Sequence, residues 1–384
     1  MKSSTTPKEQ DPLFIPLNLE SFRLGTVKPD NPMLETMSEV EATLRKHFEI
    51  VDWQGVELLL ATSVAHYAPG EMLWLREIGA SRSGKTELLR AISENPDCAK
   101  MEAITPAALR GGLKEGAKLL ARIDGKLVIT KDMATLLTTR KDARTEIFGL
   151  LRPIKDGELV FDFGSEEGYL PQKAKFDWIV ATTPVFEQHR QLESLLGERF
   201  IDLRWIPGNR EDMAFQAGKN NPYLESIRTE LATGVCSLME RAKTSSFGTL
   251  SEAEIKIISE FGDKAARLRT PVQRDRFHKL VSYPEPEIGT DLTQGFCRIV
   301  QGLKMLGLSR YGPYINRLIW DCMPKMRSQV LGCLVRGETS ADNIAKETKL
   351  SSRAIEYHLE DLRLLEVIDA KNKLMHAITH MSDV

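Results

Sequence analysis

Cysteine is scarce in this sequence of 384 residues, and its five copies are far apart. Cys98, Cys236, Cys297, Cys322 and Cys333 have neither the spacing of a metal site nor that of a disulfide framework. This cysteine usage therefore argues against a disulfide-stabilised secreted domain and against a zinc module. It fits a reducing compartment, so we expect a cytoplasmic protein.

Long apolar runs and an excess of charge of one sign are also missing. No uncharged apolar run reaches membrane-spanning length, and the N-terminal stretch MKSSTTPKEQDP lacks the apolar core of a signal peptide. The formal net charge is −2, so any attraction to DNA or to an anionic surface has to come from local patches. We therefore expect neither membrane insertion nor export.

What remains is an ordinary globular composition, with 42% apolar and 28% charged residues. The length predicts two or three domains, and the sequence contains no internal repeat. Residues 1–34 combine prolines with polar residues, which favours an extended arm over a core element. The prolines of this arm are Pro7, Pro12, Pro16, Pro29 and Pro32.

The clearest motif is the stretch WLREIGASRSGKTELLRAIS, residues 74–93. An apolar run over 72–78 predicts a strand, and Leu88, Leu89 and Ile92 recur at helical spacing. Between them lies GASRSGKT, in which four residues separate two glycines and the second glycine is followed by lysine and threonine. Chance is the alternative explanation for such a pattern, and the flanking strand and helix argue against it.

This spacing suits a phosphate chain, because a loop that bends at glycines points several backbone N–H groups inward. Gly79, Ser83 and Gly84 would form that cradle, next to the positive end of the helix that follows. Lys85 would reach the β- and γ-phosphates, and the Thr86 hydroxyl would bind Mg²⁺. The sequence therefore predicts ATP and Mg²⁺ as cofactors.

The rest of the first half alternates between strand and helix patterns. Strands are predicted at 125–133 and 176–184, with a helix at 143–157 between them, so we expect an α/β fold with a parallel sheet. Two short alternating runs around a turn at 164–168 predict an inserted hairpin. Helical periodicity dominates residues 34–67 and 208–319, with an interruption at 282–289.

Hydrolysis of ATP needs a carboxylate near the metal, usually at the end of a strand beside the strand of the phosphate loop. Asp132, in the run LVITKDM, is the candidate. Lys131 precedes Asp132 at the position where many ATPases have a second acid. Whether Asp132 would bind the metal, act on the attacking water or do both therefore stays open. Thr182 and Thr183 end the next strand, where they would touch the γ-phosphate or simply form a turn.

The order GASRSGKT, LVITKDM, ATTP and LLGERF resembles that of an AAA+ ATPase. More narrowly, KDMATLLTTRKDARTEIFGLLRPIKDG, TTPVFEQHRQLESLLGERF and RLRTPVQRDR resemble the ATPases of phages, plasmids and integrative elements, which are similar to minichromosome maintenance helicases. The resemblance covers residues 40–380 and is most specific over 70–205. It implies a ring, usually a hexamer, with ATP between subunits, DNA as the substrate and replication proteins as further partners.

The same resemblance implies roles for several arginines. Arg199 in GERF matches the finger that enters the neighbouring subunit's site, where a guanidinium neutralises charge at the γ-phosphate. A local pairing of Arg199 with a carboxylate is the alternative. The segment KAARLRTPVQRDRFHK resembles the lid with a second sensing arginine, which is either Arg269 or Arg274.

The hairpin over 158–176 resembles the pore hairpin that grips DNA in the related helicases. Lys173 and Lys175 are its basic residues and the candidates for DNA contact. Its tip carries Glu166 and Glu167, however, which weakens the case for a DNA grip.

The C-terminal segment, residues 322–384, has three helical stretches followed by two short strand-like runs, which predicts a winged helix-turn-helix. Ser340 and either Ser351 or Ser352 would cap its second and third helices. The recognition helix, about 352–364, would present Arg353 and Tyr357 outward, and Lys371 and Lys373 would lie in the wing. The segment has nine basic and nine acidic residues, so docking of a protein in place of DNA stays open.

These features divide the chain into an arm (1–34), an AAA+ P-loop core (35–207), a helical lid (208–321) and a winged helix (322–384). The leading hypothesis is an ATP-dependent, ring-forming DNA motor that acts in replication of a mobile element. The alternative is an ATP-switched DNA-binding initiator or regulator that does not separate strands.

Overall fold

The computed structural model describes residues 32–81, 83–110, 119–133, 136, 139–157, 159–161, 170–189, 199–245, 248–338 and 340–375. Nearly all of the proline-rich arm predicted for 1–34 lies outside these residues. The acidic hairpin tip with Glu166 and Glu167 also lies outside them.

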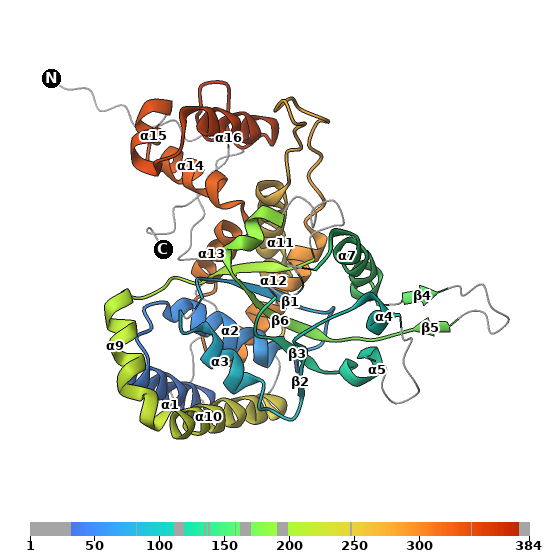
Figure 1. The fold of residues 1–384 in the computed structure, drawn as a ribbon, viewed down its shortest axis with the longest axis vertical. Coiled ribbons are helices and arrows are strands. Elements are labelled where there is room, and N and C mark those ends of the chain that lie inside the picture. Colours follow the sequence, from blue (N-terminus) through green and yellow to red (C-terminus); the bar gives the residue numbers. More distant parts are fainter. Residues whose placement is uncertain are drawn as a thin grey trace.

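A sheet of five parallel strands forms the centre of the fold (Figure 1). Its order is β2-β3-β6-β1-β7, and β1, the strand before the glycine loop, is an inner strand. The register pairs Ile78 at the end of β1 with both Thr182 and Arg204, so three strands end at the same edge. The strands are β1 (Trp74–Ile78), β2 (Cys98–Lys100), β3 (Leu127–Thr130), β6 (Asp177–Thr182) and β7 (Ile201–Arg204).

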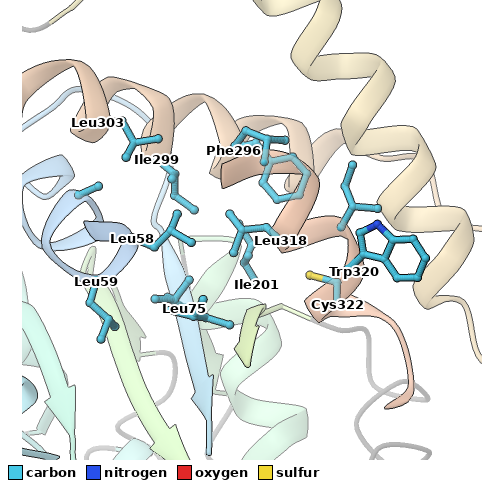
Figure 2. Packing of buried hydrophobic residues seen from close by; sticks show 14 of the residues in the cluster. Leu58, Leu59, Leu75, Ile201, Phe296, Ile299, Leu303, Leu318, Trp320 and Cys322 are labelled. Atoms are coloured by element: carbon cyan, nitrogen blue, oxygen red, sulfur yellow. The ribbon is translucent and has the colours of Figure 1, made fainter. Parts of the chain in front are cut away.

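Helices cover both faces of the sheet, which explains why every residue of β1, β3 and β6 is buried. On one face Leu75 and Ile201 pack among Leu58, Phe296 and Leu318, as Figure 2 shows. The helices of this face include α2 (Trp53–Ala65), α3 (Lys85–Ile92), α12 (Thr290–Met305) and α13 (Gly312–Cys322), with α1 (Pro32–His47), α10 (Leu224–Thr244) and α11 (Glu252–Arg269) packed on them.

The opposite face is built around aromatic side chains. Trp74, Phe176, Trp178 and Phe200 contact one another with ring centroids 5.2–6.2 Å apart. Residues of α4 (Pro106–Leu109), α5 (Leu119–Ile123) and α7 (Lys141–Lys155) complete this second core. Three short elements connect the layers: η2 (Pro184–His189), α9 (Arg210–Asn220) and η3 (Asn221–Tyr223).

The inserted hairpin predicted from the sequence is present. β4 (Leu159–Phe161) pairs antiparallel with β5 (Leu170–Gln172), in a two-stranded sheet separate from the central one. Figure 1 shows this hairpin projecting from the main body beyond α7.

The C-terminal segment contains three helices and one short strand pairing. They are α14 (Lys325–Val335), α15 (Ala341–Thr348) and α16 (Ser352–Leu364), followed by an antiparallel bridge between Ile368 and Leu374. Ser351 caps α16 and accepts a hydrogen bond from the Ala354 N–H. The apolar core of these helices is continuous with the main one, so they pack on the rest of the chain directly.

The predicted α/β class and its parallel sheet are confirmed, as are the strands at 72–78, 125–133 and 176–184. Two strands, β2 and β7, were not predicted. The helices at 34–67 and 143–157 and the mainly helical stretch after 208 are also present. None of the helices in the described ranges is long and apolar enough to cross a membrane.

Candidate functional site

The loop from Gly79 to Gly84, here the 79–84 loop, joins β1 to α3 at the carboxyl edge of the sheet. Gly84 precedes α3 as its N-cap and has a left-handed backbone, φ 88°, which favours glycine. A Cβ at Gly79 would lie 2.9 Å from the Trp205 Cβ, so no larger residue fits. The Gly79 N–H donates to the Thr182 carbonyl of β6 over 3.1 Å, which fixes the start of the loop.

Lys85 and Ser83 are buried polar groups at this loop. Lys85 is the first residue of α3 and is only 4% exposed, yet its ammonium group makes no hydrogen bond within the described part of the chain. The Ser83 hydroxyl is buried and likewise lacks a partner there. Buried polar groups are normally hydrogen-bonded, and an anionic ligand such as a phosphate would satisfy both. Thr86, the next residue of α3, is half-buried.

Trp205 supports the 79–84 loop through its contacts with Gly79 and Ser83, and the sequence did not predict this role. Its indole Nε1 donates to the Ser83 carbonyl over 2.9 Å, and its backbone N–H donates to the Ile78 carbonyl over 2.8 Å. Trp205 directly follows β7, a strand that the sequence reasoning did not assign. The alternating run IDLRW after Phe200 was the available signal.

Glu77 is the second residue that the sequence reasoning missed. It lies on β1 two residues before Gly79, is fully buried, and neither carboxyl oxygen has a hydrogen-bond partner among the described residues. Burial raises the pKa of Glu77 to about 8, against a lowering by the Lys85 charge. A charged residue inside a strand that is buried on both faces was a readable signal in WLREI.

Asp132 and Thr183 lie at the same edge of the sheet as the loop. The Met133 N–H donates to the Ala181 carbonyl over 2.8 Å, which holds Asp132 beside the end of β6, with its side chain exposed. Thr183 is half-buried, and Thr182 is buried with its hydroxyl unpartnered among the described residues.

The expectation that the acid-bearing strand adjoins the loop strand is wrong. β6 lies between β1 and β3, so the axes of β1 and β3 are about 10 Å apart. The threonines, and not the acid, are on the strand next to β1.

Arg199 and Arg269 lie at the opposite edge of the sheet, where β1 and β7 begin. Both line one cleft with Lys155. Arg199 pairs with Asp291 at 2.5 Å and with Asp156 at 3.4 Å, as the local-pairing alternative expects. Arg269 is buried against Glu287, and its guanidinium donates to the Phe200 carbonyl over 3.3 Å. Neither arginine therefore meets the 79–84 loop of its own chain.

Arg274, the other candidate for the sensing role, contacts the C-terminal helices. It pairs with Asp361 at 2.7 Å and with Glu360 at 2.8 Å, both on α16, and its guanidinium lies 4.9 Å from the Tyr357 ring. These contacts place Arg274 between the 270–281 segment and α16, away from the glycine loop.

Among the candidate DNA contacts, Tyr357 does not project freely from α16. Its ring stacks on His278 with centroids 5.2 Å apart, and its hydroxyl accepts a hydrogen bond from Arg353 over 2.7 Å. Arg353 itself is exposed, as are Lys371 and Lys373, whose backbone N–H groups both donate to the Asp369 carboxylate. The 270–281 segment therefore covers part of the predicted recognition surface.

The two hairpin lysines, Lys173 and Lys175, are exposed after β5. Lys175 lies 4.0 Å from Glu71 in an exposed ion pair. The structure therefore leaves both side chains accessible, at the base of the hairpin and not at its tip.

Comparisons with known proteins do not identify a family for this chain. No protein-family model matches the chain, and a search among curated proteins gives no match either. Within the described ranges there is also no cluster of three or more His, Cys, Asp or Glu side chains that could hold a metal ion.

Proposed function

We propose that this chain is an ATPase whose nucleotide site is the 79–84 loop together with the start of α3. The observation that carries the proposal is Lys85, which is 4% exposed and has no hydrogen-bond partner among the described residues, at the first turn of a helix behind a loop that requires glycine at both ends. A lysine is costly to bury without a partner, and a triphosphate supplies one.

The residues of the site have complementary roles. Backbone N–H groups of the loop and the amino end of α3 would bind the β- and γ-phosphates, and Lys85 would neutralise their charge. Thr86 and Asp132 would hold Mg²⁺, which neutralises phosphate charge when bound. Thr183, at the end of the strand adjoining β1, would orient the attacking water.

Arg199 can serve such a site only in a neighbouring copy of the chain. β1 separates it from the loop by about 13 Å of strand, since Arg199 precedes the start of β7 and the loop follows the end of β1. A ring in which each copy offers its Arg199 to the next copy's Lys85 resolves this separation, provided that Arg199 leaves Asp291. Arg269 lies beside Arg199 and would face the same neighbour.

With the sequence resemblance, this shared site supports a ring-forming motor that acts on DNA in replication of a mobile element. One observation favours the alternative, an ATP-switched initiator without strand separation. The predicted recognition helix is partly covered, because Tyr357 is held by His278 and Arg274. Release of that contact by ATP would regulate DNA binding without strand separation.

The test is ATP turnover with and without DNA, and strand displacement on a forked duplex, for the wild type, Lys85→Ala and Lys219→Ala. Lys219 is an exposed lysine at the end of α9 and serves as the control. We expect turnover in the wild type and the control and its loss in Lys85→Ala, because this lysine would neutralise the charge of the phosphates. Equal turnover in all three proteins would refute the site, and turnover without strand displacement would select the initiator.

A further inference from the structure

Glu77 is a carboxyl group in a place that the fold does not explain. It lies on the central strand β1, it is fully buried, and both its oxygens lack hydrogen-bond partners among the described residues. A buried carboxyl group without partners costs free energy, whereas Gln or Leu would fill the same volume without an ionisable group. A residue that weakens the fold in this way is expected where function requires it.

The charges around Glu77 come from three helices. Lys85, at the start of α3, is the cation that acts on it, and Asp52, at the cap of α2, is the anion. Asp52 is itself neutralised by Arg317 of α13, with contacts of 2.5 and 2.6 Å. Among the described residues, Lys85 is therefore the charge that acts on Glu77 without being neutralised by a neighbour.

The Lys85 side chain is folded toward β1. Its Cδ lies 3.3 Å from the position that a Cβ on Gly79 would occupy, and Gly79 directly follows the strand that carries Glu77. Because side chains two residues apart on a strand point to the same face, the Lys85 stem lies on the side of the sheet to which Glu77 points.

We propose that Glu77 is a positioning residue for Lys85, which draws the ammonium group toward β1 and competes with the nucleotide triphosphate for it. This inference rests on the proposed nucleotide site. When Glu77 is ionised, it holds Lys85 back and repels the phosphates; when Glu77 is protonated, Lys85 is free to engage them. Nucleotide binding is then accompanied by uptake of a proton at Glu77.

The expected pH dependence follows from the sign of this linkage. The raised pKa of Glu77, about 8, means that the carboxyl group is neutral at pH 6.5 and ionised at pH 9.5. Affinity for nucleotide should fall above pH 8 in the wild type, by up to about tenfold for each pH unit. Glu77→Gln has no such group, so its affinity should exceed that of the wild type at pH 9.5 and equal it at pH 6.5.

The experiment measures binding of a fluorescent, non-hydrolysable ATP analogue with Mg²⁺ between pH 6.5 and 9.5. The readout is the ratio of the Kd of each variant to that of the wild type, which removes the titration of the analogue itself. Glu57→Gln is the matched control, because Glu57 is another carboxyl group whose pKa is raised by burial, but it accepts a hydrogen bond from Tyr314 and its charged neighbours are Glu41 and Arg45 of α1. Its ratio should stay near one throughout.

If the Kd ratio of Glu77→Gln does not change with pH while Lys85→Ala abolishes binding, the role of Glu77 is overturned but the nucleotide site is not. Absence of binding by the wild type at every pH overturns the proposed nucleotide site as well. Calorimetry of the wild type at pH 8.5, in two buffers of different ionisation enthalpy, gives a measurement that does not depend on a variant. Uptake of nearly one proton supports the inference, and uptake of none overturns it.

Discussion

Trp205 shows how one side chain determines the shape of a loop far from it in sequence. Its indole donates to the carbonyl of Ser83, and its Cβ fills the space that a side chain at Gly79 would need. The hydrogen bond fixes the orientation of the peptide group between Ser83 and Gly84, at the end of the loop. At the proposed nucleotide site, Trp205 would therefore act through the loop and not by direct contact.

We predict that Trp205→Phe weakens binding of an ATP analogue about fivefold, since one neutral hydrogen bond contributes about 1 kcal/mol. The aromatic packing is retained, so the melting temperature should change by a few degrees at most. Titration of the fluorescent analogue measures the affinity, and calorimetry in the absence of nucleotide measures the melting temperature. Unchanged affinity together with a large drop in melting temperature would mean that Trp205 supports the fold only.

At the scale of elements, the C-terminal helices are held to the body of the protein through Asp361 on α16. This buried carboxylate accepts from Arg274 at 2.7 Å and lies 3.4 Å from the buried Arg327 guanidinium. Arg327 in turn donates to the carbonyls of Leu268 and Thr270 at the end of α11. One carboxylate therefore joins α14, α16 and the 270–281 segment.

We predict that Asp361→Asn destabilises the protein by about 3 kcal/mol at pH 7, because two arginines lose their counter-charge. Burial raises the pKa of Asp361, but the neighbouring His358, with its Nδ1 3.5 Å away, the charge of Arg327 and the hydrogen bond from Arg274 outweigh it, so the net shift is downward. A lowered pKa gives stability above the ordinary pKa of aspartate that is lost as the pH falls through the lowered value.

Urea unfolding at pH 7 and at pH 3 measures this difference, which should be smaller at pH 3. Glu356→Gln, an exposed carboxylate on the same helix, is the control and should leave stability unchanged. An Asp361→Asn protein as stable as the control at pH 7 would contradict the account.

The sequence predicted those elements whose signal is local. The glycine loop, the apolar runs of β1, β3 and β6, and the start of α16 at Ser351 all follow from adjacent residues. β2 was missed because a strand of three residues carries little periodicity, whereas β7 was missed although the alternating run IDLRW indicates it. The strand order could not be predicted from adjacent residues, because nothing near Asp132 in the sequence indicates that β6 lies between β3 and β1.

The site residues divide in the same way. Lys85 and Thr86 belong to a contiguous motif, whereas Trp205 and Glu77 matter through contacts that only the folded chain creates. The stacking of Tyr357 on His278 likewise joins segments that are distant in sequence, so the partial coverage of Tyr357 could not be predicted.

At the scale of the whole molecule, the two halves of the proposed catalytic site lie at opposite edges of one sheet. Lys85 follows the carboxyl end of β1, and Arg199 precedes the amino end of β7. Such an arrangement is complete only in a head-to-tail assembly, because each copy then supplies the half that its neighbour lacks.

Mixing Lys85→Ala and Arg199→Ala proteins before assembly tests this central claim most directly. Each variant alone should have lost ATP turnover, and at equal mixing about a quarter of the interfaces should join an intact Lys85 to an intact Arg199. The account predicts that turnover reappears in the mixture and is greatest near equal proportions. No recovery at any ratio, with co-assembly verified by cross-linking, would contradict a nucleotide site shared between copies of this chain.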